Sequence, residues 1–147
     1  MNEQMIRKNN MKIYPIYQMF SWDLLFYFAI SFLFLTQVKG FTASQILIAD
    51  SFYAISRIFF QIICINLVDF IGKPKSLLLG NALVTMSILL IILGNSLLFL
   101  IFAFFIQAIG YSLKGICEPT ILSDSIPESS SSSKIYAKID GKGSSFY

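Results

Sequence analysis

Apolar residues in this chain occur in long blocks, and not at the three-to-four-residue spacing of a half-buried helix. Four blocks approach or exceed the roughly 20 residues that a helix needs to cross the hydrocarbon core of a bilayer. Because a helix satisfies its own backbone hydrogen bonds in lipid, we predict an all-α membrane protein with four transmembrane helices. Their expected bounds are residues 13–37, 44–71, 76–93 and 97–123.

The breaks between these blocks carry residues that end and begin helices. Lys39-Gly40 followed by Thr42 predicts a turn and then a helix N-cap. The Gly-Lys-Pro-Lys run at 72–75 predicts the end of one helix and the start of the next, with proline in the first turn. Gly-Asn-Ser at 94–96 predicts a tight hairpin.

Basic residues outside the blocks indicate the topology. Eight of them lie before the first block, between the second and third, or after the fourth, and Lys39 alone lies on the other side. The positive-inside rule therefore predicts that both termini are cytoplasmic, in a cell membrane. The eight are Arg7, Lys8, Lys12, Lys73, Lys75, Lys134, Lys138 and Lys142.

The polar ends complete the expected organisation: a cytoplasmic N-terminus (1–12), a transmembrane region (13–126) and a cytoplasmic loop or tail (127–147). The serine run at 129–133 predicts flexibility there. Residues 143–147 resemble the entry into a further apolar helix that is missing.

Composition excludes several classes of function. Hydrophobic residues make up 56% of the chain and charged residues 13%, compared with about 45–50% and about 25% in soluble domains. The net charge of +3 is too small to suggest a nucleic-acid partner. Histidine is absent, and Cys64 and Cys117 lie inside predicted spans. We expect no metal, no cofactor and no enzyme, since the common hydrolase motifs are missing as well.

Charged residues inside the blocks are the main functional clue. A charge at the bilayer centre costs at least about 2.5 kcal/mol on insertion scales. Asp23, Arg57, Lys114 and Glu118 nevertheless lie within predicted spans. With polar neighbours three or four residues away, they form one polar stripe on each of three helices. The third span carries only Asn81 and Thr85 near one end, and we expect it to be the most lipid-exposed.

Two interpretations of the stripes remain open. In the first, they line a water-accessible substrate or ion pathway, with Gly110 and Gly115 allowing close approach of a neighbour or ligand and Pro119 bending the helix. In the second, they hold helices together, with Arg57 paired to Asp23 and Lys114 to Glu118. The pathway residues would be Asp23, Tyr27, Arg57, Gln61, Gln107, Tyr111, Lys114 and Glu118.

The segment 66–75 resembles the cytoplasmic loop signature of the major facilitator superfamily, G-x-L-A-D-R-x-G-R followed by basic residues. Ile65 and Phe70 depart from the signature, at its first glycine and first basic residue. The fourth span also resembles that family's fourth helix through Phe105, Gln107, Gly110, Pro119 and Leu122. The residues that match the loop are Leu67, Asp69, Gly72, Lys73 and Lys75.

The resemblance implies a secondary transporter that moves a small solute by alternating access, built from two six-helix halves. It implies that the loop governs conformational switching, with Asp124 paired to Lys73 or Lys75. Its partners would be the lipid bilayer, a small solute with or without a coupling proton, and the missing C-terminal helices. The resemblance covers only the first four of twelve expected helices, which implies that the chain is an N-terminal fragment and would not transport alone. The alternatives are a complete four-helix membrane protein, acting as an oligomeric pore or interaction scaffold, and a disfavoured membrane enzyme.

Overall fold

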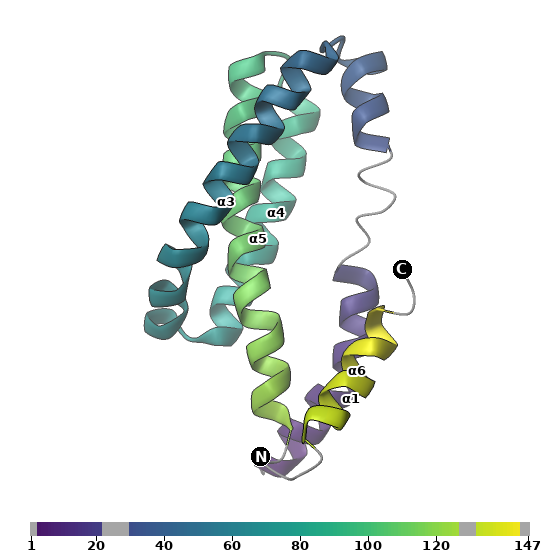
Figure 1. Ribbon diagram of the computed structural model, residues 1–147, viewed down its shortest axis with the longest axis vertical. Coiled ribbons are helices and arrows are strands. Elements are labelled where there is room, and N and C mark those ends of the chain that lie inside the picture. Colours follow the sequence, from purple (N-terminus) through teal and green to yellow (C-terminus); the bar gives the residue numbers. More distant parts are fainter. Residues whose placement is uncertain (1–2, 22–29, 127–131, 145–147) are drawn as a thin grey trace. The chain divides into compact units, whose positions relative to one another are not determined.

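The computed structural model describes residues 3–21, 30–126 and 132–144 of the chain. Over these residues the structure contains helices and no strands (Figure 1), which confirms the predicted all-α class. The elements are α1 (Glu3–Ser21), the π-helical turn η1 (Phe34–Val38), α3 (Ala43–Ile71), α4 (Lys73–Leu93), α5 (Leu97–Ser125) and α6 (Ser132–Ser144).

Three of the described helices, α3, α4 and α5, are long and apolar enough to cross a membrane. They coincide with the second, third and fourth predicted spans to within three residues at each end. The predicted first span, 13–37, includes residues 22–29, which lie outside the described residues. Its beginning belongs to α1 and its end to η1. Whether it spans the membrane therefore stays a prediction.

The structure divides into two compact units. One contains Ser31–Glu118, and thus η1, α3, α4 and most of α5; the other contains Met1–Ile30 and Pro119–Tyr147, and thus α1, α6 and the last turns of α5. We call them the three-helix unit and the terminal unit. In the three-helix unit, α3, α4 and α5 run side by side in alternating directions (Figure 1).

The turns of the three-helix unit form at the predicted residues. Thr42 caps α3 in a capping box with Gln45, in which each side chain bonds the other's backbone N–H. Gly72 lies between the end of α3 and the start of α4. Its φ of +92° is a backbone conformation that residues with L side chains rarely adopt. Pro74 follows in the first turn of α4. Gly94 caps the C-terminus of α4 before α5 begins at Leu97.

Lys39 ties together the two loops at the end of the three-helix unit away from Gly72. Its ammonium donates to the backbone carbonyl of Ile92, in the last turn of α4, and to Asn95 Oδ1 at 2.8 Å. It also lies 5.7 Å from the centroid of the Phe34 ring. A cation at a helix C-terminus is favourable because the backbone carbonyls there are unpaired.

Helix α5 is the most buried of the three apolar helices. In its most apolar stretch 61% of the residues are buried, compared with 22% in α4 and 11% in α3. The expectation that the third span is the most exposed is therefore wrong for the described residues, because α3 is more exposed than α4. The polar spacing of α3 suggested a covered face, whereas only a narrow strip of this helix is buried, at Ile46, Ala49, Cys64 and Val68.

Helices α4 and α5 approach each other through two glycines. A Cβ atom built on Gly80 would lie 3.0 Å from the Gly110 carbonyl oxygen, and one on Gly110 would lie 2.7 Å from Val84 Cγ2. The predicted close approach is thus confirmed at Gly110. At Gly115 no described helix comes close: a Cβ there would meet nothing within 4 Å, and the residue is exposed, so close approach of a ligand at this position stays a prediction.

In the terminal unit, α1 packs along α6 (Figure 1). Gln18 Nε2 donates to Asp140 Oδ1 at 3.3 Å, and Asn10 Nδ2 donates to Ser125 Oγ at 3.3 Å. Burial, with a smaller contribution from the Asp140 carboxylate, raises the pKa of Tyr136 on α6. The segment predicted as a loop or tail, 127–147, thus contains a helix, α6. Contact with α1 stabilises this helix.

Candidate functional site

A buried ion pair on α5 forms the centre of the candidate site. Lys114 Nζ lies 3.9 Å from Glu118 Oε1, one helical turn away, and the side chains are only 3% and 4% exposed. At this low exposure both charged groups have lost most of their hydration, which costs free energy that their mutual attraction must offset. The predicted pairing of Lys114 with Glu118 is confirmed.

The rest of the α5 stripe lies beside this pair. Gln107 and Tyr111 are 5% and 3% exposed. The Lys114 ammonium lies 5.7 Å from the centroid of the Tyr111 ring, within the range of a cation–π contact. All four predicted α5 residues are therefore buried together along one helix.

Helix α3 covers one flank of the stripe. The Tyr53 ring packs edge-on against Tyr111, with centroids 6.5 Å apart, and its hydroxyl accepts a hydrogen bond from Arg57 Nη1 at 3.4 Å. Ser112 Oγ donates to the backbone carbonyl of Arg57 at 3.2 Å, and this bond joins α5 to α3. Sequence reasoning did not include Ser112 in the site. A signal was present, because Ala108 and Ser112 are small residues four apart, as at many helix interfaces in membranes.

Helix α4 covers the other flank with small residues. The Lys114 stem runs past Gly80: its Cγ would lie 3.3 Å from a Cβ at that position. Ser76, one turn from Gly80, is fully buried, and its hydroxyl makes no hydrogen bond with any group that the structure describes. Amides and charges mark a polar face in a sequence, and this face carries small residues in their place. The small buried residues Ser76, Gly80 and Ser87 recur at helical spacing.

Other predicted pathway residues are not gathered at this pair. Gln61, on α3, is exposed, as is Asp50 earlier in the same stripe. Asp23 and Tyr27 lie outside the described residues, so the predicted Arg57–Asp23 pair stays a prediction. The described site thus consists of the Lys114–Glu118 pair, its polar neighbours on α5, and the Tyr53–Arg57 turn of α3.

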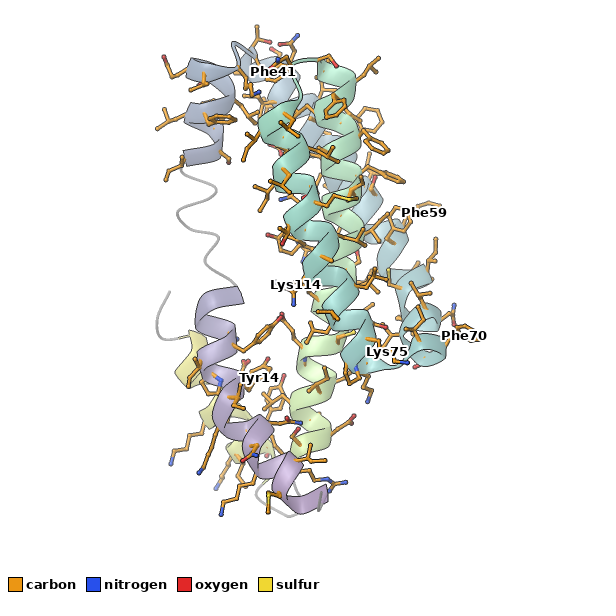
Figure 2. The ribbon with its side chains drawn as sticks, turned by 180° about the vertical axis from the view of Figure 1, so that it is seen from behind. Tyr14, Phe41, Phe59, Phe70, Lys75 and Lys114 are labelled. Atoms are coloured by element: carbon orange, nitrogen blue, oxygen red, sulfur yellow. The ribbon has the colours of Figure 1, made fainter. Side chains whose placement is uncertain are left out.

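The loop residues lie around Gly72, at the end of α3 and the start of α4. Leu67 and Lys73 are partly buried, whereas Asp69 and Lys75 are exposed. Phe70, at the position of the signature's first basic residue, is 89% exposed and points away from α4 and α5, as does Phe59 (Figure 2). Asp124 belongs to the terminal unit. Its pairing with Lys73 or Lys75 therefore stays a prediction.

The described residues contain no group of three or more His, Cys, Asp or Glu side chains that could hold a metal ion. Comparison with known proteins finds no matching family model, no similar curated protein and no similar solved structure. The three apolar helices make the chain compatible with a membrane protein.

Proposed function

We propose that this chain forms one wall of a solute pathway in a secondary transporter of the major facilitator type, working by alternating access in the cell membrane. The observation that carries the proposal is the Lys114–Glu118 pair, buried in a helix apolar enough to cross a bilayer. Ionisable residues in such helices commonly mark substrate or ion pathways.

Stability alone is a poor explanation of this pair. Replacing a buried ion pair by apolar residues of similar volume is often neutral or stabilising, because two charges must lose their hydration. The contact is also long for an ion pair, at 3.9 Å. In a coupling site, such a pair exchanges one partner for a proton or a charged solute.

The resemblance of the loop at 66–75 to the major facilitator signature also supports this proposal. Gly72 provides the positive φ of the turn, and Asp69, Lys73 and Lys75 surround it at the ends of α3 and α4. In this proposal these residues control switching between access states and do not contact the solute. Four spans with both termini cytoplasmic, including the predicted span 13–37, are part of the proposal.

The charges of the site suggest a class of solute. Arg57 and Lys114 are the basic groups near the polar stripe, and a negatively charged or zwitterionic solute would complement them. Glu118 and, in the undescribed segment, Asp23 are the candidate proton carriers. Further helices from outside the sequence given would supply the opposite wall.

One observation favours a second candidate, an oligomeric pore or scaffold. Asp50 and Gln61 are exposed on a helix long and apolar enough to span a membrane. Polar groups in lipid need a protein partner or a water-filled cavity. That partner is either the further helices of a transporter or a second copy of this chain.

Thiol labelling tests both candidates. Cys64 and Cys117 are first replaced by serine. Single cysteines are then placed at Lys114 and Glu118, at Leu89 as a 55%-exposed apolar control, and at Lys75 as an exposed loop control. The chain is reconstituted in vesicles with a membrane-impermeant thiol reagent on both faces.

A pathway predicts that Lys114→Cys and Glu118→Cys react faster than Leu89→Cys and more slowly than Lys75→Cys. Reaction no faster than that of Leu89→Cys would contradict it and favour the packing interpretation. Gln61→Cys provides the test of the second candidate: an oxidative cross-link between two copies at this position would favour the oligomer.

A further inference from the structure

The exposed face of α1 combines basic and apolar side chains. Met5, Ile13 and Ile16 are 58–60% exposed, and Lys8 and Lys12 are exposed beside them. At about 100° per residue these five positions fall within an arc of about 140°, on one side of the helix. The opposite side, which includes Asn10 and Gln18, faces the rest of the terminal unit.

Helix α6 adds a second basic stripe to the same unit. Lys134 and Lys138 are exposed and four residues apart. Tyr136 and Asp140, also four apart, are partly buried, and Asp140 accepts a hydrogen bond from Gln18 of α1. The lysines of α6 therefore project away from the α1–α6 contact and remain available to a partner.

The charge of this surface is strongly one-sided. Of the side chains that the structure describes on α1 and α6, five are basic and all five are exposed, whereas the one acidic side chain, Asp140, is partly buried and hydrogen-bonded. We define the basic surface as Lys8, Lys12, Lys134 and Lys138.

We propose that the basic surface binds the phosphate groups of anionic phospholipids in the membrane leaflet on its side of the bilayer. The apolar neighbours decide between a lipid and a soluble anion. A soluble phosphate makes no apolar contact with the exposed Ile13 and Ile16, whereas a lipid offers headgroup phosphates to the lysines and acyl chains to the isoleucines. The inference does not depend on the transport proposal.

The test uses the whole chain, purified in detergent and mixed with equal amounts of phosphatidylglycerol and phosphatidylcholine. Native mass spectrometry then measures how much of each lipid the chain retains. Attraction to an anionic lipid is worth about fivefold in affinity for each basic residue near the surface. We therefore expect a clear preference for phosphatidylglycerol, lowered at least about tenfold in K8Q/K12Q and in K134Q/K138Q.

Matched variants make the result specific. K73Q/K75Q removes two lysines outside the basic surface and is expected to retain phosphatidylglycerol as the unaltered chain does. K8R/K12R keeps the charge and is expected to retain it as well. Replacing Ile13 and Ile16 with serine keeps the charge but is expected to weaken retention, because the apolar contact is lost.

Three results would overturn the proposal: equal retention of the two lipids, a loss in K73Q/K75Q as large as in K8Q/K12Q, or displacement of the lipid by an excess of inorganic phosphate. The last would show a general anion site. Circular dichroism monitors the helix content of each variant. If a glutamine variant unfolds, the lipid preference of the unaltered chain and the phosphate competition decide the question.

Discussion

Gly110 is the residue at which a single methyl group should have the largest effect on helix packing. A Cβ there would lie 2.9 Å from the Gly80 carbonyl oxygen as well as 2.7 Å from Val84 Cγ2, and the backbone oxygen cannot rotate away. We expect Gly110→Ala to lower the free energy of unfolding in detergent by about 1–3 kcal/mol, the usual effect of overpacking.

Gly115 is the matched control on the same helix. A Cβ at this position meets nothing within 4 Å, so alanine adds no clash. We expect Gly115→Ala to raise the free energy of unfolding by roughly 0.4–1 kcal/mol, because alanine restricts the unfolded chain. Equal effects at the two glycines would contradict the assigned close approach of α4 and α5.

The Lys114–Glu118 pair should behave as one unit. Removing one partner takes the counter-charge from the other buried group, so Lys114→Met and Glu118→Gln should each lower the free energy of unfolding by about 3–5 kcal/mol. The double variant should lose much less than the sum of the two. Chemical unfolding in detergent provides this double-mutant cycle, and strictly additive losses would show that the pair is not coupled.

For single residues, the sequence predicted well which charged and amide side chains of α5 share one face, and poorly which small residues pack against them. Spacing alone placed Gln107, Tyr111, Lys114 and Glu118 on one face, and the structure buries all four. The contact of Ser76 and Gly80 with the site was not predicted, because a small residue in an apolar helix changes the mean hydropathy of that helix very little. Their role depends on which helix lies opposite, and that is decided by tertiary packing.

Among the elements, the connection between the end of η1 and the α4–α5 turn depends on Lys39. Its ammonium bonds a carbonyl in the last turn of α4 and the Asn95 side chain. We expect Lys39→Met to lower the free energy of unfolding by about 1 kcal/mol, because the bonds are partly open to solvent. Lys75→Met, an exposed lysine at the other end of α4, is the control and should change it by less than about 0.5 kcal/mol. Similar losses in both variants would contradict this role.

Helix boundaries were predictable because particular residues dictate them. Thr42 can cap a helix, and Gly72 can adopt a positive φ before Pro74 restarts one. The formation of α6 was not predictable in the same way. Its sequence is polar and rich in serine and glycine, and it packs against α1, a segment more than a hundred residues earlier. The high exposure of α3 was not predicted for a related reason. A polar stripe in a sequence does not show how much of the helix a neighbouring helix covers.

For the molecule as a whole, the structure supports a helical protein with three helices able to cross a membrane, and transport remains a proposal built on the buried pair and the loop resemblance. The transport proposal requires one arrangement in the membrane. The loop at Gly72 and helices α1 and α6 must lie on the cytoplasmic side, and the loops at Lys39 and Asn95 on the other.

Topology mapping tests that arrangement most directly. Reporters that are active on only one side of the membrane are fused after Lys39, Lys75, Asn95 and Lys138, each in a separate chain. The account predicts that fusions after Lys39 and Asn95 report the outside and that fusions after Lys75 and Lys138 report the cytoplasm, because eight basic residues lie on that side against one. A fusion after Lys75 that reports the outside, or one after Lys138 that does so, would contradict it.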